Sequence, residues 1–324
     1  MAASVAYLAP DGALLESFQG QAPEGAEIKW VDSSQSIEQQ AADLEGVAAV
    51  IVSPSVYPVE LARLTPSVRL VQTTSAGTDM IDKQTLGELG IRVANNGGGN
   101  AISVAEHTIT LLVSVFRKMQ LQYNTVQAGE WAGSIRSDWF SQAYEIAGKT
   151  VGIIGLGRIG SRVARRLQGW ECDIVYTDVV PIDPEVEAEL NATRMPMDEL
   201  LQTADIITLH VPLGRSTTKL ISDREFDLMK PSAVLINACR GPVVDEAALI
   251  RAIRDKKIMA AGLDVLEEEP TSPDNPLFGF DNVLITPHLA SFTQESGERS
   301  RAFAMYNTAK VAGGEDPESI VLPD

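Results

Sequence analysis

The sequence predicts an α/β protein built on two parallel β-sheets. Short runs rich in β-branched residues alternate with helical segments, which is typical of βαβ units. Most of these runs are apolar throughout, as expected of strands buried on both faces of a parallel sheet. They fall into two series, separated by the glycine cluster NNGGGN at 95–100 and an apolar segment at 101–120. A chain of 324 residues is long enough for two domains.

The elements follow in order along the chain. The first series predicts strands at 4–9, 26–32, 47–52 and 68–73. The segment SIEQQAADLEG between two of them has helical character. Residues 101–120 are predicted to form one long helix, too apolar to be surrounded by water, so we expect it at the centre or at a subunit interface. The second series begins near Lys149 and predicts strands at 150–155, 172–178, 205–211, 233–238, 259–265 and 282–287.

Composition excludes several classes of partner. The net charge of −18 would repel both nucleic acid and an acidic membrane surface. No apolar run reaches the length of a membrane span, and the first residues lack a secretory signal, so we expect a cytoplasmic protein. Two cysteines in a chain of this length form no disulfide framework. We predict no metal site.

A glycine-rich turn predicts a dinucleotide site. Gly155, Gly157 and Gly160 form a G-x-G-x-x-G pattern that follows a predicted strand and opens an amphipathic helix. The glycines permit a tight turn and close approach of the backbone to a pyrophosphate. The next strand ends at Asp178, where a carboxylate accepts hydrogen bonds from a ribose 2′-OH. No Arg or Lys follows directly, so NAD is favoured over NADP.

Three histidines are candidates for the proton donor that carbonyl reduction with a nicotinamide requires. We expect His107 to be packed and hydrogen-bonded inside the apolar helix, and His210 to flank the cofactor at a strand end. His288 follows a strand and lies in a loop at the carboxyl edge, where catalytic groups are usually built. Position alone leaves the choice between a catalytic and a structural His288 open.

Two charged residues complete the predicted site. Arg240 follows the strand AVLINAC, and its planar guanidinium suits a substrate carboxylate, with a structural ion pair as the alternative. Glu269, before Pro270, can accept the Nδ1 proton of His288 and orient the ring. We expect its neighbours Glu267 and Glu268 to face solvent.

Seven ordered blocks resemble the D-isomer-specific 2-hydroxyacid dehydrogenases, over essentially the whole chain, and glyoxylate and hydroxypyruvate reductases in particular. These blocks are TSAGTDMID (74–82), NAISVAEHT (100–108), GKTVGIIGLGRIG (148–160), LHVPLGRSTTKLI (209–221), INACRGPVVDEAAL (236–249), AAGLDVLEEEP (260–270) and TPHLAS (286–291).

The resemblance implies a role for each residue that matches the family pattern. Arg240 would bind the substrate carboxylate and 2-oxygen, Glu269 would partner the catalytic histidine, and His288 would be the acid/base. The backbone amides of Ser75, Ala76 and Gly77 would clamp the carboxylate, and Asn100 matches a substrate-binding position. The cofactor residues implied by the fingerprint and the family blocks are Thr108, Gly155, Gly157, Arg158, Ile159, Gly160, Asp178, His210, Pro212, Thr217 and Asp264.

The resemblance also implies the domain organisation and the partners. Residues 1–100 and 289–324 would form a flavodoxin-like substrate domain, split around an NAD-binding Rossmann domain at 101–288 that also makes a homodimer. The substrate would be a small 2-ketoacid or 2-hydroxyacid. Alternatives of the same fold are phosphite or formate dehydrogenases and a non-catalytic NAD-sensing corepressor-like scaffold. Glu269 argues against formate, where no proton moves.

Two segments depart from the family pattern. Phe292 replaces a small residue near His288 and would narrow the pocket or face a partner subunit. The link at 133–145 is longer than usual, and its Trp139 and Phe140 would cover the cleft, reach the other subunit or pack on the surface.

Overall fold

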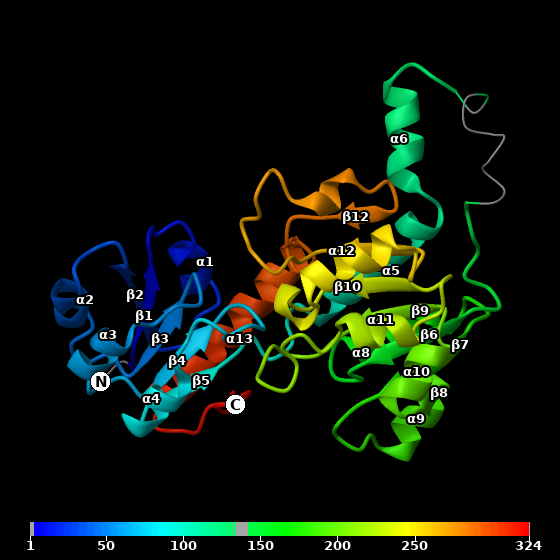
Figure 1. Ribbon diagram of the computed structural model, residues 1–324. Coiled ribbons are helices and arrows are strands. Elements are labelled where there is room, and N and C mark those ends of the chain that lie inside the picture. Colours follow the sequence, from blue (N-terminus) through cyan, green and yellow to red (C-terminus); the bar gives the residue numbers. More distant parts are fainter. Residues whose placement is uncertain (1–2, 132, 134–141, 324) are drawn as a thin grey trace. The chain divides into compact units, whose positions relative to one another are not determined.

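The computed structural model describes residues 3–131, 133 and 142–323 (Figure 1). It divides into two compact units, one formed by Met1–Asn100 with Phe292–Asp324 and the other by Ala101–Ser291. Trp139 and Phe140 lie outside the described residues, so the expectations for them stay untested.

The first unit is a five-stranded parallel sheet in the order β2-β1-β3-β4-β5. Its strands are β1 (Ala3–Ala9), β2 (Ala26–Asp32), β3 (Ala49–Val52), β4 (Leu70–Thr73) and β5 (Arg92–Ala94). Its helices are α1 (Leu15–Gln19), α2 (Ile37–Asp43), α3 (Val59–Leu64), α4 (Lys83–Glu88) and α13 (Gln294–Ala312). Every residue of β3 and β4 is buried, which accounts for the continuous apolar sequence of β3, whereas β4 ends in the buried polar residues Gln72 and Thr73.

Helix α13 ties the C-terminal segment to this sheet. It packs against β1, β3 and β4, and Figure 1 shows it in red beside the blue strands of the unit. Its buried Asn307 donates a 2.7 Å hydrogen bond from Nδ2 to Oε1 of Gln72 on β4. The two ends of the chain therefore share one core.

The second unit is a seven-stranded parallel sheet in the order β12-β11-β10-β9-β6-β7-β8. Its strands are β6 (Thr150–Ile154), β7 (Asp173–Thr177), β8 (Ala192–Arg194), β9 (Ile206–Leu209), β10 (Val234–Asn237), β11 (Ala260–Leu263) and β12 (Val283–Ile285). Because all seven run the same way, the residues that follow them meet at one edge of the sheet, where α/β proteins bind ligands.

Helices cover both faces of this sheet (Figure 1). They are α5 (Ala101–Phe116), α6 (Met119–Gln127), α8 (Gly160–Leu167), α9 (Pro184–Leu190), α10 (Met197–Thr203), α11 (Asp223–Leu228) and α12 (Glu246–Arg254), with 3₁₀ turns η2 (Gly241–Val243) and η3 (Pro276–Gly279). Helix α5 packs against α8 and against β10, β11 and β12. It therefore contacts the three strands that precede the loops of Arg240, Glu269 and His288.

The structure corrects the sequence analysis in two respects. The predicted single helix at 101–120 ends at Phe116, and α6 begins after Lys118, whose left-handed φ of 47° breaks the helical path. The edge strands β5 and β8 were not predicted, because each has only three residues and includes an arginine. Among the described residues, no helix is both long and apolar enough to cross a membrane.

Candidate active site

The glycine turn after β6 has the close contacts that its glycines require. Gly155 has a left-handed φ of 93°. A Cβ on Gly160 would lie 2.0 Å from the carbonyl oxygen of Gly155, so only glycine fits there. Gly157, in contrast, has no neighbour within 4 Å of the position a Cβ would occupy, which leaves the turn open to a ligand. This combination of a tight turn and an open face fits the pyrophosphate of a dinucleotide.

Asp178, directly after β7, is fixed by the same turn. Its Oδ2 accepts a 2.7 Å hydrogen bond from the backbone of Leu156, and its Oδ1 accepts one of 2.9 Å from Val180. The exposed Arg194, on β8, donates a 2.9 Å hydrogen bond to the carbonyl oxygen of Asp178. No Arg or Lys directly follows Asp178 in sequence; Arg194 reaches it only through the pairing of β7 with β8.

His210 follows β9 and lies against the glycine turn, where its carbonyl oxygen would be 2.5 Å from a Cβ on Gly155. Its Nε2 is 2.9 Å from Thr208 Oγ1, whereas its buried Nδ1 has no partner among the described residues. Burial lowers the pKa of His210 to about 3. A neutral ring with an unsatisfied nitrogen suits a residue that flanks a cofactor and transfers no proton.

Four other predicted cofactor residues make contacts within the fold. The Thr217 hydroxyl donates 2.6 Å to the carbonyl of Pro212 and so closes the turn after β9. Thr108 is buried, and its hydroxyl bonds the carbonyl of Val104 one turn back in α5. Ile159 packs on a small buried cluster next to the glycine turn. Arg158 accepts a 2.8 Å hydrogen bond from Arg162 at its carbonyl oxygen.

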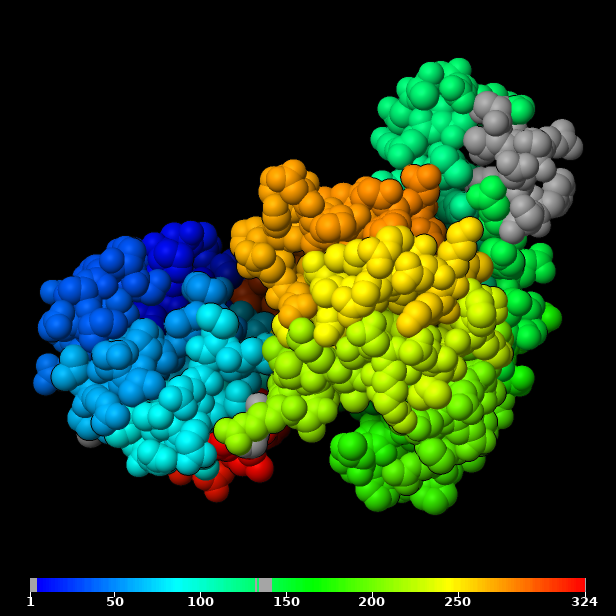
Figure 2. Space-filling model, in the orientation of Figure 1, coloured from blue at the N-terminus to red at the C-terminus, as the bar shows by residue number. Residues whose placement is uncertain are grey.

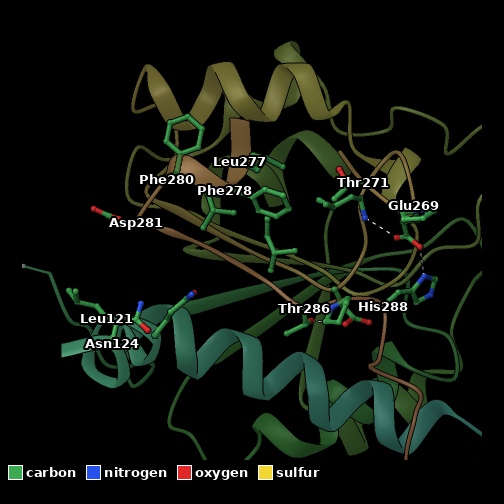
Figure 3. A pocket seen from close by; sticks show the side chains of 17 residues that line it. Leu121, Asn124, Glu269, Thr271, Leu277, Phe278, Phe280, Asp281, Thr286 and His288 are labelled. Atoms are coloured by element: carbon green, nitrogen blue, oxygen red, sulfur yellow. Dashed lines mark hydrogen bonds and ion pairs between the residues drawn. The ribbon is translucent and has the colours of Figure 1, made fainter. Parts of the chain in front are cut away.

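Glu269 and His288 form a close pair of titratable groups in the loops that follow β11 and β12. His288 Nδ1 lies 2.6 Å from Glu269 Oε2 (Figure 3). The other carboxylate oxygen, Oε1, accepts a 2.9 Å hydrogen bond from the backbone of Leu266, which fixes the side chain. With Nδ1 engaged by a carboxylate, Nε2 is the nitrogen left to exchange a proton with a substrate.

A cavity of about 710 Å³ opens beside this pair. Figure 3 shows Glu269 and His288 facing each other at one end and Leu121 and Asn124 of α6 at the other. Phe278 lies between these ends. Both members of the pair therefore border an open space within the second unit.

The backbone of His288 has an unusual conformation. Its φ is 55°, in the left-handed region that costs a non-glycine residue about 1–2 kcal/mol. The His288 amide donates 2.8 Å to the carbonyl oxygen of Asp264, the residue that follows β11. Strain of this kind persists only where surrounding contacts fix the loop, and it is common at functional sites.

Arg240 stands directly after the buried β10 segment. It is partly exposed, and its Nη1 donates 2.7 Å to the carbonyl of Cys239. Its own carbonyl accepts 2.9 Å from Nδ2 of Asn237, and Gly241 after it touches the Leu266 backbone so closely that no side chain would fit. Burial raises the pKa of Cys239 to about 11, so this thiol stays protonated and acts as a small packed side chain.

In the first unit, the turn Ser75–Gly77 presents its amides. The Ser75 carbonyl accepts from the Thr73 hydroxyl at 2.8 Å and from the Asn96 amide at 3.0 Å. Within residues 3–131, 133 and 142–323, the amides of Ser75, Ala76 and Gly77 donate to no other residue. Unsatisfied amides on successive residues suit an anion. Asn100 is buried, and its Oδ1 has no partner in the same described ranges.

Glu267 and Glu268 are exposed, as expected, and so is Glu269, which differs from them in its contact with His288. Glu267 nevertheless accepts a 3.2 Å hydrogen bond from the backbone of Glu246 and lies 3.7 Å from Lys219 Nζ, so it stabilises the start of α12.

The NAD-binding-domain model of the D-isomer-specific 2-hydroxyacid dehydrogenases matches residues 109–290. The chain is 34% identical over 293 residues to a glyoxylate reductase of Thermofilum pendens, which covers 90% of this chain and 85% of that protein. It is 37% identical over 273 residues to a D-3-phosphoglycerate dehydrogenase of Archaeoglobus fulgidus, covering 84% of this chain but only 50% of that protein.

The fold has a close counterpart among solved structures. The apo form of Rhodotorula graminis D-mandelate dehydrogenase superposes with a TM-score of 0.87 at 25% identity, covering 98% of this chain and 97% of the other. The likeness extends over both units.

Proposed function

Because this chain belongs to the D-isomer-specific 2-hydroxyacid dehydrogenase family, an NAD-dependent group of oxidoreductases, we propose that it reduces a small 2-ketoacid to the D-2-hydroxyacid. The observation that carries the proposal is the 2.6 Å contact between His288 Nδ1 and Glu269 Oε2. A carboxylate–imidazole pair at the edge of a dinucleotide-binding sheet supplies the proton that ketone reduction needs.

In the proposed reaction, NADH supplies a hydride to C2 of the substrate when it is bound. His288 donates the Nε2 proton to the ketone oxygen, so that the product is the neutral alcohol and the ring is left uncharged. Glu269 stabilises the protonated ring before transfer and keeps it oriented after transfer. In the reverse direction the neutral ring accepts the hydroxyl proton.

Substrate orientation is proposed to depend on cations and amides. Arg240, held by Asn237 and Cys239, is proposed to bind the carboxylate and the 2-oxygen through its guanidinium. The amides of Ser75–Gly77 and the side chain of Asn100 are proposed to contribute hydrogen bonds to the same ligand class. Holding the carboxylate in a fixed geometry lowers the entropic part of the barrier.

We propose a small unphosphorylated substrate such as glyoxylate or hydroxypyruvate. Three glyoxylate reductases are among the relatives, and each is covered over 78% of its length or more. The phosphoglycerate dehydrogenase, in contrast, has half of its length outside the match. The test is NADH oxidation at 340 nm with glyoxylate, hydroxypyruvate, pyruvate and 3-phosphohydroxypyruvate. Turnover of the phosphorylated substrate alone would refute this choice, and no turnover of any 2-ketoacid would refute the reductase function.

We propose that Asp178 makes NADH the preferred cofactor over NADPH. Its carboxylate, held by Leu156 and Val180, would repel a 2′-phosphate. Asp178→Ser should therefore raise kcat/KM with NADPH by about 10-fold or more relative to NADH. Arg194→Met in the Asp178→Ser background should remove part of that gain, because Arg194 supplies the cation near this position. An unchanged ratio in Asp178→Ser would contradict the proposal.

We propose that the second unit forms a homodimer through the region of α6. This helix stands out from the body of its unit (Figure 2) and exposes 48% of Met119, 65% of Tyr123 and 53% of Val126. Large apolar side chains grouped on one projecting segment are typical of an interface. Light scattering should give twice the chain mass, and Tyr123→Glu with Val126→Glu should lower it. A monomeric wild-type protein would contradict the proposal.

We also propose that the first unit is the substrate domain and the second the NAD-binding domain, and that the protein is cytoplasmic. The glycine turn and Asp178 lie in the second unit, and the amides of Ser75–Gly77 lie in the first. Cys172 and Cys239 are both free thiols, which suits a reducing compartment. Cell fractionation tests the location, and NADH binding by the isolated 101–291 segment tests the assignment of that unit.

A further inference from the structure

We infer that His107 and Thr286 are positioning residues for His288: together with Asp264 they hold the loop at 286–290 in the conformation that presents the acid/base ring. This inference rests on the proposed function, since it assigns a role to residues that act through His288. The sequence patterns assign such a role to neither residue; for His107 they predict a packed, hydrogen-bonded side chain with no named partner.

The loop is folded around one carboxylate. Oδ1 of the buried Asp264 accepts 2.6 Å from the Thr286 hydroxyl and 3.1 Å from the amide of Leu289. Its Oδ2 accepts 2.9 Å from the amide of Ala290. These donors lie on both sides of His288, whose own amide bonds the Asp264 carbonyl at 2.8 Å. The left-handed backbone of His288 is therefore the middle of a loop that Asp264 closes.

His107 adds a contact from outside the loop. Its Nε2 lies 3.0 Å from Thr286 Oγ1 and 3.3 Å from Asp264 Oδ1. The Thr286 hydroxyl has one proton, and the short contact with the Asp264 carboxylate uses it. The hydroxyl must then accept from His107, so Nε2 of His107 carries a proton and donates. The ring thereby links α5 to the loop across 179 residues of sequence.

The charge of Asp264 fits this arrangement. Burial by itself would raise the pKa of Asp264, but hydrogen bonds from His107, Thr286 and two backbone amides outweigh it, and the pKa lies below its ordinary value. A carboxylate that stays ionised inside the protein keeps all its donors in place. The loop geometry therefore depends on each donor, and Thr286 connects two of the partners.

The test compares isosteric and conservative changes at Thr286. Thr286→Val removes the hydroxyl and keeps the shape, whereas Thr286→Ser keeps the hydroxyl. We expect Thr286→Val to lower kcat for glyoxylate reduction by about 10- to 100-fold, because a misplaced acid loses this much. NADH affinity should be unchanged, and Thr286→Ser should restore most of kcat. Equal losses in the two variants, or no loss in Thr286→Val, would overturn the inference.

A second comparison shows whether the effect passes through His288. In a His288→Gln background, Thr286→Val should lower the residual turnover no further, because the group being positioned is gone. A loss of the same size in both backgrounds would overturn the inference. His107→Phe and His107→Gln repeat the comparison from α5, since Gln retains a donor and Phe does not; this pair decides the matter if Thr286→Val does not fold.

A readout without turnover separates this inference from the proposed function. The Nδ1 proton that His288 shares with Glu269 should give a strongly downfield proton NMR signal, because the two heavy atoms are 2.6 Å apart. The signal should shift or disappear in Thr286→Val and persist in Thr286→Ser. An unaltered signal in Thr286→Val would overturn the inference, whereas a silent 2-ketoacid panel with the expected signals would refute only the function.

Discussion

Two histidine–carboxylate pairs at the same edge of the second sheet differ in the exposure of their side chains and in the number of hydrogen bonds that the carboxylate accepts. His288 and Glu269 approach to 2.6 Å, with 43% and 38% of their side chains exposed. His107 and Asp264 are 3.3 Å apart, with 23% and 1% exposed. Glu269 accepts one further hydrogen bond, from the Leu266 amide, whereas Asp264 accepts three, from Thr286, Leu289 and Ala290.

The difference fits the proposal that His288 and Glu269 exchange a proton, whereas His107 and Asp264 hold the loop in place. A buried carboxylate is stable only when its oxygens are satisfied, and Asp264 has donors on both of them. Glu269 and His288, in contrast, both border an open cavity of about 710 Å³. Under the proposed function, a histidine and a carboxylate therefore have a catalytic role in one pair and a structural role in the other, according to what surrounds them.

The largest expected effect comes from removing the exposed ring. His288→Gln should lower kcat for 2-ketoacid reduction by about 10²- to 10⁴-fold, because it removes the proposed general acid. The measurement is NADH oxidation at 340 nm, with NADH affinity determined by fluorescence titration and expected to be unchanged. His107→Gln is the matched control at the buried pair and should lose far less. Comparable losses in the two variants would erase the distinction between the pairs.

Removing the charge of the exposed pair should have the next largest effect. Glu269→Gln keeps the size of the side chain but no longer stabilises a protonated His288, and we expect kcat to fall by about 10- to 100-fold. Steady-state kinetics of Glu269→Gln over a range of pH should show that the acid limb of its kcat–pH profile is shifted from that of the wild type. A wild-type rate in Glu269→Gln would mean that His288 needs no carboxylate.

The buried pair should dominate stability. Asp264→Ala leaves the amides of Leu289 and Ala290 without an acceptor, and we expect a loss of about 3 kcal/mol in the free energy of unfolding. Glu269→Ala should cost about 1 kcal/mol or less, because its pair is half exposed. Urea unfolding measures both. A larger loss of unfolding free energy in Glu269→Ala than in Asp264→Ala would contradict the structural role of the buried pair.

The direction of the Asp264 pKa shift determines how this pair makes stability depend on pH. The pKa of Asp264 is lowered in the folded state, with burial raising it and the hydrogen bonds from His107 and Thr286 lowering it more. Its contribution to stability is therefore present above the ordinary carboxyl pKa and is lost as the pH falls through the folded value. Asp264→Ala should reduce the slope of stability against pH in acid.

The smallest expected effect concerns the third histidine, which has no carboxylate. With a pKa lowered to about 3 by burial, His210 should remain neutral at pH 5, where an ordinary histidine is mostly protonated. The unfolded chain then binds more protons than the folded one between about pH 3 and 6.5, so this residue makes stability rise with pH in that window. Nitrogen-15 NMR of the ring measures its charge, and a protonated ring at pH 5 would contradict the expectation.

Local pattern accounts for much of what could be predicted from the sequence. The strands of both sheets are short apolar runs because parallel strands are buried on both faces, and β9 and β10 are buried at every position. The glycine turn could be predicted because its three glycines lie within six residues of sequence. Three-residue edge strands such as β8 have too little pattern to be seen.

Contacts between distant segments could not be predicted in this way. Arg194 reaches the carbonyl of Asp178 only because β8 pairs with β7. His107 looks like an ordinary packed residue of α5 until the sheet brings Thr286 to it. The break between α5 and α6 could not be predicted, because the apolar pattern continues through Lys118 and only its left-handed backbone ends the helix.

The strand order of the second sheet also sets the distance between the glycine turn and the loop of Glu269. The glycine turn follows β6 and the loop of Glu269 follows β11, and β9 and β10 lie between them. Three strand spacings of about 4.8 Å separate the two, or about 14 Å. A molecule that contacts both must therefore extend over at least this distance. The proposed dinucleotide-binding turn and the proposed proton-donor loop therefore follow different strands, so a substitution in one loop can leave the other loop unchanged.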